Sequence, residues 1–164
     1  MAKTYEPIAT TTLGSSSSTV TFSSIPATYT DLVLVSSSTQ TAGPVNSRMR
    51  FNGDSGTNYS RTWLSGQGTG AYSGRGSNRT SFELDYYTSP GTGNLTIVHV
   101  MNYANTTTYK TVLDRTGRAA EGTEAVVGLW RKTPEAITSI EYSLDGAGSF
   151  AAGSTFTLYG IKAA

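Results

Sequence analysis

Short runs in which apolar and polar side chains alternate recur along the whole chain. In residues 19–23 the apolar side chains fall on one face of an extended segment and the hydroxyls on the other, as in a strand with one solvated face. Residues 32–35 and 97–101 are apolar on both faces, which is typical of strands in the middle of a two-layer structure. The pattern predicts about eleven short strands: 7–13, 19–23, 31–36, 46–51, 59–64, 80–86, 94–103, 108–115, 123–130, 137–144 and 155–161.

These runs, with turn residues between them and little helical signal, predict an all-β fold. We expect an antiparallel β-sandwich, jelly-roll-like, of about 8–11 short strands in a single domain over residues 1–164. Residues 1–13 are expected to form an arm that pairs with a neighbouring subunit or with the sheet edge, because exposed strand edges need cover. Seven apolar residues are expected inside the sandwich: Phe22, Leu34, Phe51, Val98, Leu129, Ile140 and Leu158.

Three connections carry their own signals. The pair Asn52-Gly53 predicts a hairpin between residues 46–51 and 59–64. Residues 65–79, rich in Gly and Ser, exceed ordinary connection lengths and predict a loop that is functional or mobile. Thr133 before Pro134 predicts a single helical turn.

Composition excludes several kinds of protein. The chain of 164 residues has no cysteine, so it has no disulfide, thiolate metal site or thiol nucleophile. Its 27 Thr and 21 Ser favour strands and turns over long helices. Twelve basic against eleven acidic residues give a net charge of +1, which argues against direct nucleic-acid binding. No apolar run is long enough to cross a membrane and no apolar stretch follows Lys3, so we expect no membrane partner, no secretory leader and synthesis inside a cell.

Catalytic chemistry has little support in the sequence. The single histidine, His99, lies in the middle of a predicted strand, so a packed or hydrogen-bonded sheet residue is the favoured interpretation over a catalytic base. Two close carboxylate pairs, Glu83 with Asp85 and Glu121 with Glu124, leave a glycosidase dyad formally open, but pairs this close in sequence arise easily by chance.

Cofactor and metal signals are equally weak. Asn52, Asp54 and Asn58 offer oxygens for calcium, but the EF-hand spacing is missing and turn formation explains these residues better. The glycines between residues 66 and 76 match neither a phosphate loop nor a dinucleotide fingerprint. We therefore expect no catalytic residue, no metal and no cofactor, and a protein that is not an enzyme.

Arginine placement is the most informative charge feature. Five of the twelve basic residues fall within 32 positions, opposed there by one carboxylate and interleaved with aromatic residues. Arg and aromatic side chains together are enriched where proteins bind one another, so one interpretation is a docking surface and the other is the solvated face of a strand pair. The candidate docking residues are Arg48, Arg50, Arg61, Trp63, Tyr72, Arg75 and Arg79.

Several segments carry a family resemblance. They are residues 5–9 (YEPIA), 22–32 (FSSIPATYTDL), 50–60 (RFNGDSGTNYS), 103–105 (YAN) with 109–111 (YKT), and 156–162 (FTLYGIK). In this order they resemble small all-β structural proteins of tailed bacteriophages, especially aquatic and cyanobacterial ones. The resemblance spans nearly the whole chain and implies a β-sandwich on the capsid or tail of a virion, assembled in the host cytoplasm, with no catalytic residues to carry over.

Two virion roles fit this resemblance. A compact body with one docking face suits a capsid decoration, or cement, protein that binds the outer surface of the assembled head and stabilises it. Its partner would be the major capsid protein or another virion protein, and a homotrimer is the preferred state, because decoration proteins of this resemblance commonly sit on threefold positions. The alternative is a receptor- or carbohydrate-binding tail or tail-fibre module, with Trp63 and Trp130 as stacking platforms for a surface glycan. A glycan hydrolase is a distant third.

Overall fold

The structure, a computed structural model, describes residues 4–43, 45–87, 90–119 and 122–162. These residues form strands and no helix, which confirms the all-β prediction. The strands are β1 (Tyr5–Thr12), β2 (Thr19–Phe22), β3 (Asp31–Ser38), β4 (Val45–Phe51), β5 (Tyr59–Gln67), β6 (Gly70–Arg79), β7 (Phe82–Tyr87), β8 (Asn94–Met101), β9 (Lys110–Arg118), β10 (Gly122–Trp130), β11 (Ile140–Leu144) and β12 (Thr155–Ile161).

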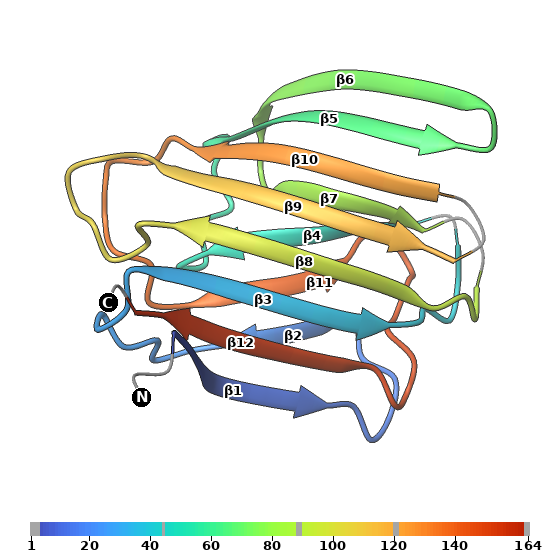
Figure 1. Ribbon diagram of the computed structural model, residues 1–164, viewed down its shortest axis with the longest axis horizontal. Helices are drawn as coiled ribbons and strands as arrows, with labels where there is room; N and C mark the ends of the chain where they lie inside the picture. The colour runs from blue at the N-terminus through green and yellow to red at the C-terminus, as the bar shows by residue number, and fades with distance from the viewer. Residues whose placement is uncertain (1–3, 44, 88–89, 120–121, 163–164) are drawn as a thin grey trace.

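Two antiparallel sheets pack face to face as a sandwich (Figure 1). The larger sheet has eight strands in the order β1-β12-β3-β8-β9-β10-β5-β6, and the smaller has four in the order β2-β11-β4-β7. Because the larger sheet continues through β5 and β6, its β6 edge projects past β7, the last strand of the smaller sheet (Figure 1).

The connectivity is that of a jelly roll with two inserted hairpins. When β5–β6 and β9–β10 are set aside, the remaining eight strands, renumbered in chain order, lie as 1-8-3-6 in one sheet and 2-7-4-5 in the other. These are the two four-stranded sheets of a jelly roll. Both inserted hairpins extend the larger sheet on the same side, which makes the sandwich asymmetric.

Aromatic side chains fill much of the space between the sheets. The ring of Phe82 packs edge to face against Phe51 and Tyr59, with centroids 5.5 and 4.9 Å apart. Trp130 packs against Phe51 at 5.4 Å. Each such pair contributes about 0.5–1.5 kcal/mol beyond the area that it buries. These rings come from β4, β5, β7 and β10, so they join the two sheets where the β5–β6 hairpin begins.

One end of the interior is polar. The hydroxyls of Thr96 and Thr116 lie 3.3 Å apart, and Thr116 donates to Asp114 at 3.2 Å. Because buried polar groups are costly without partners, this end requires specific pairing rather than apolar packing alone. The buried polar and charged residues of this end, on the inward faces of β3, β8 and β9, are Ser36, Ser38, Asn94, Thr96, Asp114, Thr116 and Arg118.

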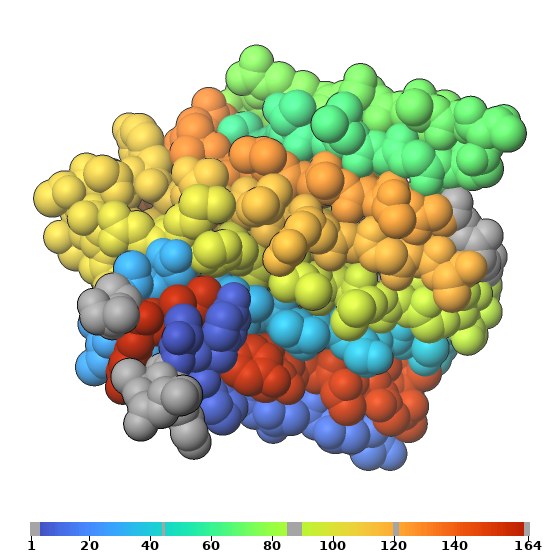
Figure 2. Space-filling model, viewed as in Figure 1, coloured from blue at the N-terminus to red at the C-terminus, as the bar shows by residue number. Residues whose placement is uncertain are grey.

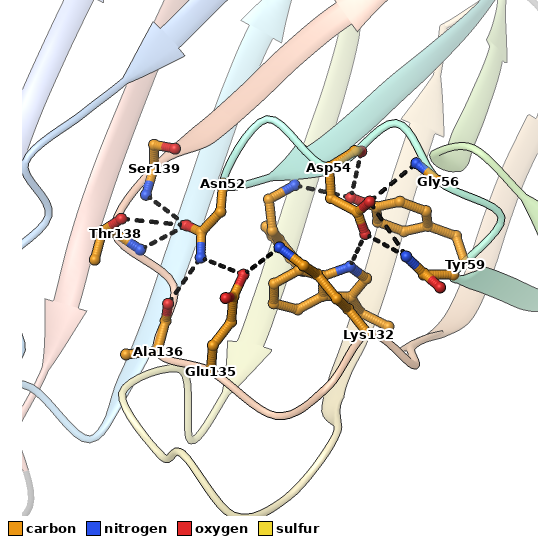
Figure 3. Close-up of polar contacts among 12 residues, drawn as sticks. Asn52, Asp54, Gly56, Tyr59, Lys132, Glu135, Ala136, Thr138 and Ser139 are labelled. Carbon is orange, nitrogen blue, oxygen red and sulfur yellow. Dashed lines mark hydrogen bonds and ion pairs between the residues drawn. The ribbon is translucent and has the colours of Figure 1, made fainter.

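Asn52 forms a corner between β4 and β5, not the predicted hairpin, because these strands belong to different sheets (Figure 3). Its backbone has a φ of 51° and that of Gly53 a φ of 66°, which turns the chain sharply. The Asn52 Oδ1 accepts from the backbone N–H of Thr138 at 2.8 Å and of Ser139 at 3.1 Å, and its Nδ2 donates to the Ala136 carbonyl at 2.8 Å. The corner therefore anchors the connection between β10 and β11.

Asp54 holds the other half of this corner (Figure 3). Its carboxylate accepts from the Gly56 N–H at 2.9 Å, from the Asn58 side chain at 3.0 Å and from the indole Nε1 of Trp130 at 2.6 Å. Partial burial acts to raise the pKa of Asp54, but these hydrogen bonds outweigh it and hold the pKa below its usual value. The Tyr59 hydroxyl donates to the Asp54 carbonyl at 3.0 Å.

Residues 65–79 are not a long irregular loop, because most of them lie in β5 and β6. The two strands pair through a tight turn in which Gly68 has a φ of 56°. Glycines at positions 70, 74 and 76 remove the side chains that would make β6 alternate between apolar and polar. The pattern that identified the other strands was therefore missing here.

Three further expectations can be compared with the structure. Residues 131–139 contain no helical turn, and the segment instead docks on Asn52. Six of the seven expected core residues are buried, but Leu129 lies on the outward face of β10 and is half-buried. β1 pairs with β12 of its own chain, with a bulge between Pro7 and Ala9, so it covers the edge of β12 and itself forms the edge strand of the larger sheet. Residues 1–3 of the expected arm lie outside the described residues.

Candidate functional site

The outward side of the larger sheet, which we call the outer face, is broad and low in charge. Figure 2 views this face, where the strands from β1 to β6 follow one another across the surface. Leu64 is 63% exposed, Leu95 49% and Val127 53%. Large apolar side chains this exposed, gathered on one face, mark an interaction surface more often than isolated ones do. The half-buried or exposed apolar residues of its centre are Leu64, Leu95, Ile97, Leu113, Ala125 and Val127.

Two arginines without ion pairs in the described part of the chain lie on the outer face, Arg115 on the inner strand β9 and Arg75 on the edge strand β6. Arg115 of β9 pairs with Ala125 of β10, and Arg75 of β6 pairs with Thr62 of β5, all at outward positions. Both arginines are exposed, and neither has an ion-pair partner among the residues that the structure describes. An acidic and apolar surface would complement this face.

Beneath the β5–β6 hairpin, on the inward side of the same sheet, lies a small cavity that we call the hollow. Its volume is about 240 Å³. The hollow forms because the larger sheet continues past β7, so the inward side chains of β5 and β6 face no full strand of the smaller sheet. Its lining residues are Asn46, Arg61, Trp63, Ser65, Gln67, Tyr72 and Glu124.

Trp63 lies against Gly74 of the neighbouring strand. A Cβ on Gly74 would come within 2.7 Å of the indole Cζ2 and 2.9 Å of Nε1, so the ring occupies the space that a side chain would need. Because both residues are on the inward side, one face of the indole covers β6 and the ring borders the hollow. Tyr72, 55% exposed, adds a second aromatic ring to the lining.

Charged groups around the hollow are paired. Arg61 Nη2 lies 2.8 Å from the Glu83 carboxylate, and Arg118 Nη2 lies 3.5 Å from that of Glu124. The Glu124 side chain is 8% exposed, and burial raises the pKa of its carboxyl against the opposing effects of Arg118 and Arg61. The Arg61 Nε is buried and has no hydrogen-bond partner in the described part of the chain. Arg61 and Glu124, the charged residues among the described lining, are therefore each already in an ion pair.

The candidate docking residues from the sequence separate onto different faces. Arg48 and Arg50 lie on the outward side of the smaller sheet, where Arg48 pairs with Asp145 at 3.1 Å and Arg50 with Glu141 at 3.4 Å. The structure brings three of the others, Arg61, Trp63 and Tyr72, to the hollow. Arg75 belongs to the outer face, and Arg79 pairs with Glu83 at 2.9 Å near the sheet edge.

Trp130, the second expected stacking platform, is only 2% exposed, so it serves the core. His99 is a hydrogen-bonded sheet residue as predicted, with Nε2 3.0 Å from the Asp31 carboxylate. Of the carboxylate pairs, Glu83 is bound by two arginines, and Glu121 lies outside the described residues. The hollow could not be predicted from the sequence, because it depends on Gly74 and on the extension of one sheet past the other.

No cluster of three or more His, Asp or Glu side chains that could hold a metal occurs among the described residues. The oxygens of Asn52 and Asp54 are used within the corner, which agrees with their interpretation as turn residues. In the same part of the chain, no helix has the length and apolar character needed to cross a membrane. In comparisons with known proteins, the chain matches no family model, no curated protein and no solved structure.

Proposed function

We propose that the chain is a non-enzymatic structural protein of a tailed-bacteriophage particle, and specifically a decoration protein that binds the outer surface of the assembled head. Two things support the proposal: the resemblance of its segments to small all-β phage proteins, and the outer face of the eight-stranded sheet. The outer face is the observation that carries the docking role. The partner is the major capsid protein or another shell protein.

The size of the outer face suits a specific contact. Eight strands spaced about 4.8 Å apart and about 8 residues long cover roughly 900 Å². Each partner in an interface of standard size contributes about 800 Å². The many Ser and Thr side chains of this face can be buried at lower cost than Lys or Glu. Because many copies bind one shell, each contact can be weak and still stabilise the assembly.

Loading of the chain onto particles that lack it tests this role. The double variant Leu95→Glu with Val127→Glu places two carboxylates at the centre of the outer face, and Thr19→Glu with Thr21→Glu places two on exposed positions of β2. We expect the first variant to lose loading by about tenfold or more and the second to load as the wild type. Normal loading of the first variant would overturn the docking role of this face.

A second candidate function is a receptor-binding module of the tail, and the hollow with its two aromatic rings favours it. The two functions differ in which surface contacts the particle and in where the chain sits. Loss of adsorption to host cells by variants that still load normally would support the tail module. The homotrimer is part of the decoration proposal, and light scattering of the purified chain measures it.

A further inference from the structure

We propose that the hollow beneath the β5–β6 hairpin binds a single neutral sugar residue of a glycan. This inference rests on the lining of the hollow. It does not depend on whether the protein sits on the head or on the tail of a particle. The hollow opens on the side of the sheet opposite the outer face, so docking through the outer face leaves it accessible.

The size of the hollow limits the ligand to one ring. Its volume of about 240 Å³ is below the range of about 300–1,000 Å³ that holds drug-sized molecules. A long apolar ligand would also find no continuous apolar wall, because Arg61, Gln67 and Glu124 interrupt it. A compact ring with polar groups at its rim fits both limits.

The lining has the two kinds of group that a sugar requires. The carbon-bound hydrogens on one face of a pyranose ring are apolar, and they pack against a flat aromatic surface such as the indole of Trp63. Hydroxyls around the ring need both donors and acceptors. Among the described lining residues, the Glu124 carboxylate is an acceptor, and the Gln67 amide offers both a donor and an acceptor.

Charge selects a neutral ligand over an anionic or cationic one. Arg61 and Glu124 are each within an ion pair, with Glu83 and Arg118 respectively. A phosphate or carboxylate would meet the buried Glu124, and a cation would meet Arg61. Hydroxyls instead add charge-assisted hydrogen bonds without displacing either pair.

Nuclear magnetic resonance titration of the full chain with glucose, galactose, mannose and N-acetylglucosamine tests the proposal. We expect saturation transfer from the protein to at least one of these sugars, and changes in backbone amide chemical shift confined to β5, β6, β10 and the start of β4, where Asn46 lines the hollow. Amide shifts elsewhere, or no response to any of the four sugars at concentrations of tens of millimolar, would overturn the proposal. This mapping needs no variant, so it stands even where a substitution disturbs the hairpin.

Variants then test the lining directly. Trp63→Ala removes the aromatic surface and Ser65→Leu fills the hollow while leaving Trp63 in place. Both should weaken binding by about tenfold or more, with the circular dichroism of the wild type. Tyr109→Ala is the control, because Tyr109 is an exposed aromatic residue that does not line the hollow. Unchanged affinity in both lining variants, or equal loss in the control, would contradict the site.

Fluorescence gives an independent readout. The chain has two tryptophans, and Trp130 is buried while Trp63 borders the hollow. A sugar stacked on Trp63 should change the emission of the wild type and leave that of Trp63→Phe unchanged. A response that persists in Trp63→Phe would place the bound sugar elsewhere. Failure of the docking variants on particles would leave this result untouched, because they alter the opposite side of the sheet.

Discussion

Arg61 of β5 donates to Glu83 of β7 twice, with Nη1 2.7 Å from the backbone carbonyl and Nη2 2.8 Å from the carboxylate. The two residues belong to different sheets, so this pair fastens the start of the projecting hairpin to the smaller sheet. It also explains why Arg61 does not act as a free docking cation. Glu83 accepts from Arg79 as well, which offers an internal comparison.

Arg61→Ala should lower the free energy of unfolding by about 1.5–3 kcal/mol, because it removes charge-assisted hydrogen bonds between side chains that are only about 15% exposed. Arg79→Ala removes the partner that is 47% exposed from the same carboxylate and should cost less than about 1 kcal/mol. Urea denaturation of the two variants measures both changes in the free energy of unfolding. Equal costs would show that the hairpin is not fastened through Arg61.

Asp54→Ala should destabilise the chain by about 1–3 kcal/mol, because the indole N–H of Trp130 would remain buried without an acceptor. Asp54→Asn keeps an acceptor oxygen at this position and should lose less stability. Thermal unfolding at neutral pH compares the two variants. A loss in Asp54→Asn as large as in Asp54→Ala would assign the effect to charge rather than to the acceptor.

The low pKa of Asp54 predicts a dependence of stability on pH. Because the folded pKa lies below the ordinary aspartate value of 3.8, the stabilisation is fully present above that value and is lost as the pH falls through the folded pKa. Unfolding of wild type and Asp54→Asn from about pH 5 to about pH 2 should therefore show a steeper loss in the wild type. Parallel curves for the two proteins would contradict this assignment.

Gly128 leaves the space that Phe82 fills in the core. A Cβ at Gly128 would lie 2.5 Å from Cε1 of Phe82, which is fully buried, so Gly128→Ala should cost about 1–3 kcal/mol through overpacking. Gly66→Ala, in the adjacent strand with no atom near its Cβ position, is the matched control and should be close to neutral. Comparable melting temperatures for both variants would indicate that Phe82 moves freely.

Charge reversal at Arg75 and Arg115 tests the electrostatic part of docking. Both arginines lie on the outer face without partners among the described residues, so replacing them by Glu should reduce loading onto particles and leave the fold intact. Loading of the wild type should weaken as salt is added, and that of the variant should change little. The opposite salt dependence would remove these arginines from the interface.

The sequence predicted the antiparallel sandwich and most of the core, because alternation reports directly which face of a strand is buried, but it did not predict the order of the strands in the sheets. Prediction from the sequence failed at glycines, which have no side chain to form a pattern, and at residues whose interaction partners lie far away in the sequence. The glycines of β6 removed its alternating pattern. In β10 the sequence of the strand alone did not show that Gly128, and not Leu129, lies on the inward face. Arg48 pairs with Asp145, 97 residues away, so no local pattern showed that this cation is already paired.

Imaging of intact particles with and without the chain tests the central proposal most directly. A decoration protein predicts additional density on the outer surface of the head when the chain is present, with the eight-stranded sheet against the shell. Particles without the chain should also withstand less heat. Density confined to the tail tip, with an unchanged head surface, would contradict the decoration role.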